Sequence, residues 1–126
     1  GDKNSTKAIF FAPDKEPDTA EGIAGKAWAG NFTLCGELLP HCPNKSAASK
    51  IKEYAEKTYS SKEMVRYYID KGRGLPRSIG AMPIEVNGQR WGVLVLDSRD
   101  PKGVSQETLE QFTVTAAIIG QLLERG

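Results

Sequence analysis

The sequence predicts one α+β domain built around an antiparallel hairpin. Asn87-Gly88 lies between two apolar runs rich in β-branched residues, which is the pattern of a two-residue type I′ turn. Helix and strand patterns are mixed along the rest of the chain, and the clearest connection between strands is this antiparallel turn. Such a mixture is typical of an antiparallel sheet with helices on its faces. The 126 residues suffice for one domain with its own core and are too few for two ordinary domains.

Counting outward from the turn predicts the register of the two strands. The expected pairs are Val86–Gln89, Glu85–Arg90, Ile84–Trp91, Met82–Val93, Ala81–Leu94 and Gly80–Val95. The second pair joins opposite charges and the third joins an aromatic ring to a β-branched side chain, and both kinds stabilise antiparallel sheets. Each strand is apolar on both faces, so the hairpin is predicted to be central and covered on each side. Pro83 lacks an N–H, which predicts an edge or a bulge on the outer side of its strand.

The elements before the hairpin follow from residue pattern in chain order. Apolar runs at 7–12 and 32–39 predict strands. A short helix is predicted at 22–30, where glycines permit close approach to a neighbouring backbone. Two further helices are predicted between residues 46 and 71, and serines supply their N-caps: Ser46 or Ser49 for the first, Ser60 or Ser61 for the second.

The last helix is predicted to begin after Ser105, whose hydroxyl suits an N-cap. Its apolar residues recur with a/d spacing: Leu109, Phe112, Ala116, Ile119 and Leu123. Ile118 and Leu122 widen this stripe, so the helix is expected to have more than one partner surface. Two interpretations stay open: the stripe packs on the sheet, or it pairs with a parallel helix that carries a signal to another module.

Composition bounds the class of protein. The net charge is +1, with 26% charged and 39% hydrophobic residues, which gives no whole-domain argument for binding nucleic acid or a membrane. No apolar run is long enough to span a bilayer, and two cysteines do not form a disulfide scaffold. We therefore expect a cytoplasmic domain. The termini suggest that residues 1–6 are a disordered expression remnant and that residues 7–126 form a single domain excised from a larger protein.

Three segments resemble the GAF domain family. They are residues 22–27 (GIAGKA), residues 77–84 (RSIGAMPI) and residues 88–97 (GQRWGVLVLD), the last followed by a closing helix. The resemblance extends from about Ala8 to the C-terminal end, although the helix that usually precedes the first strand in this family is absent. It implies a twisted antiparallel sheet with terminal helices on one face. Loops and short helices between residues 40 and 76 would lie over the other face and enclose a small-molecule pocket.

The resemblance implies a non-catalytic sensory or regulatory domain of a signalling protein, which relays ligand binding through its terminal helices and forms a homodimer through them. Residues 45–77 contain nine Lys or Arg and four Asp or Glu, so positive charge is concentrated in the segment expected to cover the pocket. This favours an anionic ligand. The candidate ligand-binding residues are Tyr54, Arg66, Tyr68, Arg73, Arg77, Met82 and Trp91. The alternative interpretations are a solvated helix face for the charges and core packing for the aromatic rings.

The two cysteines are the basis of the alternative hypothesis, in which the chain is a GAF-fold thiol enzyme of the free methionine sulfoxide reductase type. Cys35 and Cys42 lack the spacing of a zinc site or a redox pair, and one His41 adds little to a metal site. In those reductases a catalytic cysteine precedes the strand that corresponds to residues 78–84, and residues 71–76 here contain none. Bilin-binding members use Cys followed by His, whereas the order here is reversed. The cyclic-nucleotide signature cannot be assembled. The sequence thus names no cofactor and no metal, and a scaffold with a filled core is the third hypothesis.

Overall fold

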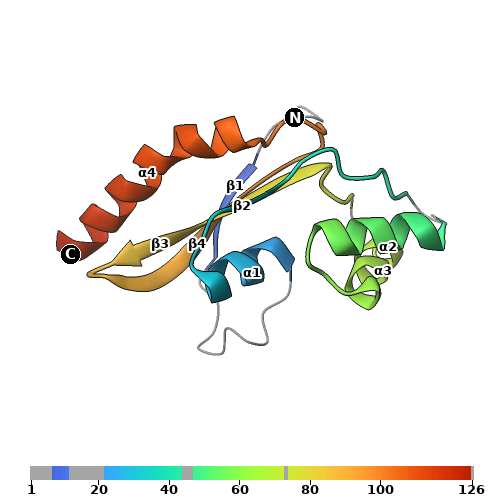
Figure 1. Ribbon diagram of the computed structural model, residues 1–126, viewed down its shortest axis with the longest axis horizontal. Helices are drawn as coiled ribbons and strands as arrows, with labels where there is room; N and C mark the ends of the chain where they lie inside the picture. Colours follow the sequence, from blue (N-terminus) through green and yellow to red (C-terminus); the bar gives the residue numbers. More distant parts are fainter. Residues whose placement is uncertain (1–6, 12–21, 44–46, 73, 126) are drawn as a thin grey trace.

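The computed structural model describes residues 7–11, 22–43, 47–72 and 74–125. Its elements are β1 (Lys7–Phe11), α1 (Gly22–Gly30), β2 (Leu34–Gly36), α2 (Ala48–Lys57), α3 (Lys62–Asp70), β3 (Ser78–Val86), β4 (Gln89–Ser98) and α4 (Gln106–Arg125). The strands form one antiparallel sheet in the order β1-β4-β3-β2, with helices on both faces (Figure 1). The α+β fold and the central place of the hairpin are therefore confirmed. The prediction for residues 1–6 lies outside the described residues.

The hairpin turn has the predicted geometry, but the register changes two pairs beyond it. Asn87 and Gly88 both have positive φ, 53° and 76°, as a type I′ turn requires. Val86–Gln89 and Glu85–Arg90 pair as predicted, and then Ile84 pairs with Gly92 instead of Trp91. The predicted pairs further out are therefore wrong by one residue.

A β-bulge that contains Trp91 causes this change of register. Arg90 reaches from the bulge to the C-terminal end of α1, where its guanidinium donates to the carbonyls of Trp28 and Ala29. A one-residue shift exchanges the faces of a strand. It places Leu94 opposite Met82 and leaves Trp91 with 44% of its surface exposed.

The face of the sheet beneath α4 carries the larger apolar side chains. Met82, Ile84, Leu94 and Leu96 are buried there against Leu109 of α4 and Val104 before it. Phe112, Ala116 and Ile119 continue the contact, so the a/d stripe packs on the sheet. Gly80 makes room for this packing, because a Cβ there would lie 2.7 Å from a methyl carbon of Leu109. The outward residues of the same helix, Ile118 and Leu122, are exposed.

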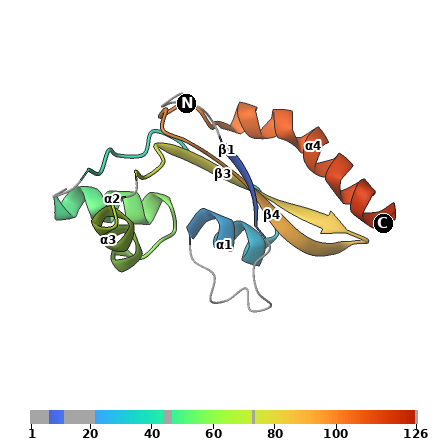
Figure 2. The same ribbon diagram turned by 180° about the vertical axis from the view of Figure 1, so that it is seen from behind.

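The opposite face is covered by α1 along the hairpin and by α2 and α3 at one end of the sheet (Figures 1 and 2). Ile23 and Ala27 of α1 pack on Ala81 and Val93. The α2–α3 pair forms its own core and meets the sheet through Ile79. The short helices therefore cover different parts of this face. Because α1 occupies the middle, residues 40–76 reach only the end of the sheet near Ser78.

Local details show where tertiary contacts modify sequence preferences. Ser61 and Ser105 cap α3 and α4 through the backbone N–H groups of Met64 and Thr108, as predicted. The N-cap of α2 is Ala47, so the prediction for Ser49 is wrong, since this serine lies inside the helix; Ser46 lies outside the described residues. Strand β2 is shorter than residues 32–39, because positive φ angles at Asn31 and Leu38 bend the chain away on either side.

The edge predicted at Pro83 is present. In the described part of the chain, β2 pairs with β3 only from Ile79 to Ala81, so no β2 residue lies opposite Pro83 on that side. None of the described helices is long and apolar enough to cross a membrane.

Candidate functional site

A pocket of about 390 Å³ opens where α3, the 41–43 loop and the base of the hairpin meet. One part of its wall is apolar or sulfur-containing and the other is basic. The lining side chains are those of His41, Cys42, Ile69, Leu75, Arg77 and Arg99, together with Pro43 and the glycines at positions 72 and 74. The volume lies within the range of natural small-ligand sites.

Arg77 is held in place by the chain on both sides of the pocket. Its backbone N–H donates to the Ser98 carbonyl at 2.8 Å, and its carbonyl accepts from the Leu39 N–H at 2.9 Å. Its side-chain Nε also donates to the Leu39 carbonyl at 2.6 Å. These bonds fix the guanidinium through one edge, and its terminal Nη groups donate to no acceptor in the described residues.

Arg99 follows β4 and lies against Gly74. A Cβ added at Gly74 would lie 2.3 Å from its Nη2 atom, so the absence of a side chain at Gly74 lets the guanidinium approach the backbone closely. Within the described ranges, Arg99 forms no hydrogen bond and no ion pair; the ion pair found there joins Lys57 to Glu53 on the surface of α2. In the described residues no carboxylate forms an ion pair with either guanidinium of the pocket, although the charges of Asp97 and Arg77 both act on the Tyr54 hydroxyl nearby.

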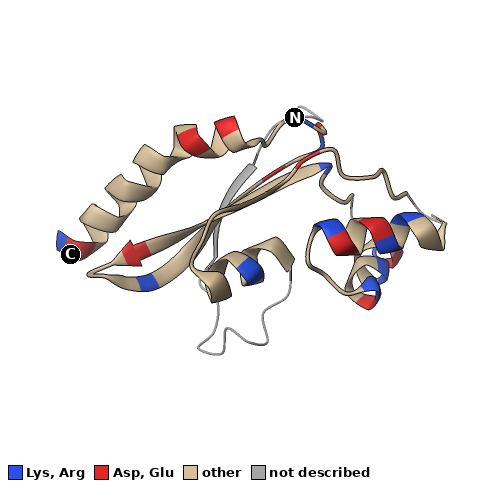
Figure 3. Ribbon diagram, in the orientation of Figure 1, with Lys and Arg blue, Asp and Glu red and all other residues tan. Residues whose placement is uncertain are grey.

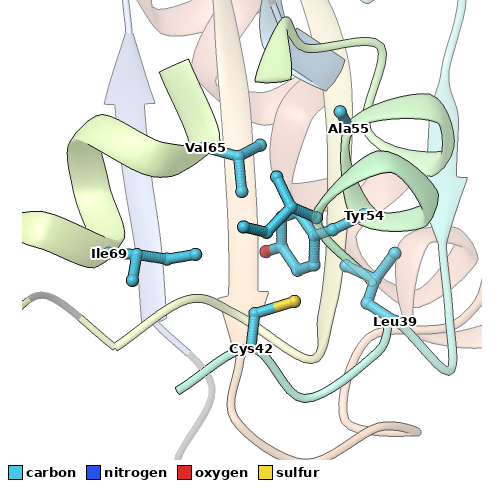
Figure 4. Close-up of a cluster of buried hydrophobic side chains, with 7 residues drawn as sticks. Leu39, Cys42, Tyr54, Ala55, Val65 and Ile69 are labelled. Carbon is cyan, nitrogen blue, oxygen red and sulfur yellow. The ribbon is translucent and has the colours of Figure 1, made fainter. Parts of the chain in front are cut away.

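The apolar wall belongs to the core between α2 and α3 (Figure 4). Cys42 points toward Tyr54 and Leu39 in this cluster, and its Sγ lies 3.7 Å from the Lys50 carbonyl. Burial is the largest influence on the Cys42 thiol and raises its pKa; Glu53 adds to this effect, while Lys50 and Arg77 oppose it. A raised pKa keeps the thiol protonated near neutral pH and unreactive as a nucleophile.

Cys35 lies on the other face of the sheet, beneath α4. Its thiol contacts the Val104 carbonyl at 3.8 Å, and burial, with a smaller effect of Glu37, raises its pKa as well. The two cysteines therefore lie in separate cores. In the described part of the chain no group of three His, Cys, Asp or Glu side chains is placed to hold a metal ion.

The structure brings one of the described candidate residues, Arg77, into the pocket. Tyr54 lies beneath it in the core, where burial raises the pKa of its hydroxyl and this group donates to the Pro76 carbonyl at 2.7 Å. This bond supports the backbone next to Arg77. Arg73 lies outside the described residues.

Three further candidates lie on or near the surface, away from the pocket lining. Arg66 is exposed on α3, and Tyr68 of the same helix is half-buried with its ring edge-to-face against Tyr67. Figure 3 shows Lys, Arg, Asp and Glu interspersed over α2 and α3, as expected of a solvated face. Trp91 is half-exposed at the bulge.

Met82 is buried beneath α4, on the face of the sheet opposite α1, α2 and α3. The structure therefore separates it from Arg77 and from the pocket. Because of the bulge at Trp91, Leu94 pairs with Met82 and lies on the same face of the sheet.

Sequence reasoning missed Arg99, although a signal for it was present. Arg77 precedes β3 and Arg99 follows β4, so both lie at the open end of one hairpin, beyond the Ser78–Ser98 pair. Counting back from the Asn87-Gly88 turn pairs Arg77 with Ser98, which places Arg99 one residue further along the other arm of the hairpin and so near Arg77.

The model of the GAF domain family matches residues 35–123, which is more than half of the chain. The chain therefore belongs to the GAF domain family, whose members are sensory or regulatory domains that bind small molecules. A search of curated proteins found no match to this chain.

Proposed function

We propose that this chain is a non-catalytic sensory domain of a cytoplasmic signalling protein, and that it binds a small organic anion in the pocket beside Arg77 and Arg99. The observation that carries the proposal is that both guanidinium groups line one cavity without a described carboxylate partner. Arginine offers forked donors that match carboxylate and phosphate oxygens. The apolar wall from Ile69 and Leu75 would contact the uncharged part of the ligand.

A route from this pocket to α4 supports a regulatory role. Ser78 and Ser98, which adjoin the two arginines, are almost fully buried. The Ser78 hydroxyl donates to the Asp100 carbonyl at 2.7 Å and accepts from the Val104 N–H at 2.9 Å. A ligand that moves either arginine therefore acts on the loop that positions the start of α4.

The outward face of α4 is the surface through which we propose that the signal leaves the domain. Val114, Ile118 and Leu122 recur every four residues on this face and are 65%, 49% and 61% exposed. The middle of the helix carries no charged residue (Figure 3). Such a face suits a homodimer in the complete protein, as helices commonly pair through an apolar stripe.

Ligand-dependent thermal stability tests the proposal. The protein is screened with small carboxylates, phosphates, nucleotides and tetrapyrroles, and a ligand at 100 times its Kd should stabilise the fold by about 2.7 kcal/mol. Arg99→Gln should remove that stabilisation. Arg66→Gln, which removes an exposed charge from α3, should retain it. Equal stabilisation of both variants by every effective ligand would refute binding at this pocket.

The thiol-enzyme alternative stays testable because Cys42 lines the same pocket. Its raised pKa and that of Cys35 favour the non-catalytic proposal. Assay of free methionine sulfoxide reduction should detect no turnover by the wild-type protein. Turnover that Cys42→Ser or Cys35→Ser abolishes would establish the enzyme instead.

A further inference from the structure

The two pocket arginines lie at the same end of the β3–β4 hairpin, each one residue outside its strand. Ser78 and Ser98 form the last pair between β3 and β4, and Arg77 and Arg99 are the next residues outward. The Arg77 N–H bonds to the Ser98 carbonyl, which keeps the two chain segments together at this point. Both arginines line the same cavity. Two like charges that share a cavity repel each other, and an anion that binds there relieves this repulsion.

The local backbone orients the Arg77 side chain and leaves room for that of Arg99. The Nε–H bond to Leu39 directs the terminal nitrogens of Arg77 away from that carbonyl. Gly74 lets the Arg99 guanidinium approach its backbone closely, where any larger residue would displace it. His41 is the third basic side chain in the lining, and the lining contains no Asp or Glu among the described residues.

From these observations we infer that the pocket selects a compact dianion, either a dicarboxylate or a phosphate monoester, and that each arginine binds part of its charge. This inference rests on the proposed function and specifies the ligand class. A monoanion would neutralise one guanidinium and leave its neighbour uncompensated in a partly apolar cavity. A dianion neutralises both, and two charge-assisted, forked contacts become available at once. The volume of about 390 Å³ and the wall formed by Ile69 and Leu75 leave room for a short apolar body.

Titration with simple anions tests the charge selectivity. Malonate and inorganic phosphate at pH 8 serve as dianions and acetate as the monoanion, at constant ionic strength set with NaCl. Binding is measured by calorimetry and by the shift in Tm. We expect malonate, phosphate or both to bind the wild-type protein at least tenfold more tightly than acetate. Malonate alone indicates a dicarboxylate ligand and phosphate alone a phosphate monoester.

Three variants localise the effect. Arg99→Gln should reduce dianion affinity to the level of acetate, whereas Arg66→Gln should keep the full preference. Gly74→Ala should weaken dianion binding without removing any charge, because its Cβ displaces the Arg99 guanidinium. In the absence of added anion, Arg99→Gln should raise Tm, since the repulsion with Arg77 is gone; a lower Tm would argue against that repulsion.

Two results separate this inference from the proposed function. If acetate binds as tightly as malonate and phosphate, and Arg99→Gln abolishes that binding, the dianion preference is overturned while an anion site remains. If neither dianion binds more tightly than acetate and Arg99→Gln has no effect on any anion in the wider screen, both the inference and the proposed function fail.

Discussion

Gly120→Ala tests the contact between α4 and the tip of the hairpin. Gly120 is buried, and a Cβ at this position would lie 2.8 Å from the Glu85 carbonyl oxygen. Ordinary contact begins at 3.4 Å, so the helix must move away by roughly 0.6 Å. Alanine gains about 0.5–1 kcal/mol over glycine in a helix interior, but overpacking against an atom that cannot yield costs about 1–3 kcal/mol. We expect the variant to be about 1 kcal/mol less stable than the wild-type protein.

Urea unfolding measures this change, with an accompanying fall in Tm of about 4 °C for a domain of this size. The Asn87 N–H, which donates to the Glu124 carboxylate at 2.9 Å, should exchange faster with solvent as the helix moves. Gln121→Ala serves as the control, since it changes an exposed residue of the same turn and should alter stability by no more than about 0.5 kcal/mol. A Gly120→Ala protein as stable as the wild type, or more stable, would show that α4 does not rest on the Glu85 backbone.

Three further predictions concern buried polar groups. Ser78→Ala leaves the Val104 N–H and the Asp100 carbonyl without their partner, so the free energy of unfolding in urea should fall by about 1–3 kcal/mol. A smaller loss of stability than that caused by replacing an exposed serine with alanine would contradict the role of this hydroxyl. Tyr54→Phe removes the bond to the Pro76 carbonyl and should cost about 0.5–1.5 kcal/mol, with an unchanged far-UV spectrum as the control and no loss of stability as the contrary result. The Cys42 pKa is raised above 9.0 in the folded protein, so the unfolded chain releases this proton first and stability should fall as pH rises through about 9. Unfolding between pH 8 and 10.5 should show a smaller fall for Cys42→Ala than for the wild type, and equal slopes would refute this contribution.

Local pattern was enough to predict the elements that depend on few residues. The Asn87-Gly88 turn requires positive φ at both positions, and these residue types supply it, so the hairpin and its central position followed from sequence. The serine caps of α3 and α4 act within one helical turn and were also correctly assigned. The chain bend at Asn31 was not foreseen, although asparagine with positive φ is a known C-terminal cap and the Phe32 N–H here bonds back to the Ala27 carbonyl of α1. The bend at Leu38 has no such local pattern, and its N–H bonds to the distant Pro101 carbonyl.

The pocket was harder to predict than the fold because its residues come from separate segments. Arg77 was found through its place in a basic segment, whereas Arg99 stands alone in a turn and gains its role only from its position beside Arg77. Met82 was assigned to the same site because the basic segment was expected to cover its face of the sheet, whereas α4 covers that face. A charge count over residues 45–77 could not separate these cases, since most of its cations lie on the solvated face of α2 and α3.

The bulge itself has a long-range cause, which explains why counting from the turn failed beyond Glu85. The Asn31 side chain donates to the Glu85 carboxylate at 3.0 Å, and Arg90 binds the last carbonyls of α1 while its guanidinium lies 5.3 Å from the centre of the Trp28 ring. On the opposite face, Gly120 of α4 lies on the Glu85 carbonyl. The same hairpin tip is therefore held by both helices. The extra residue in β4 lets the tip meet α1 while the strand beyond it keeps its apolar side chains beneath α4. This register depends on contacts between residues 35 to 62 positions apart, and no short window of sequence around the turn contains them.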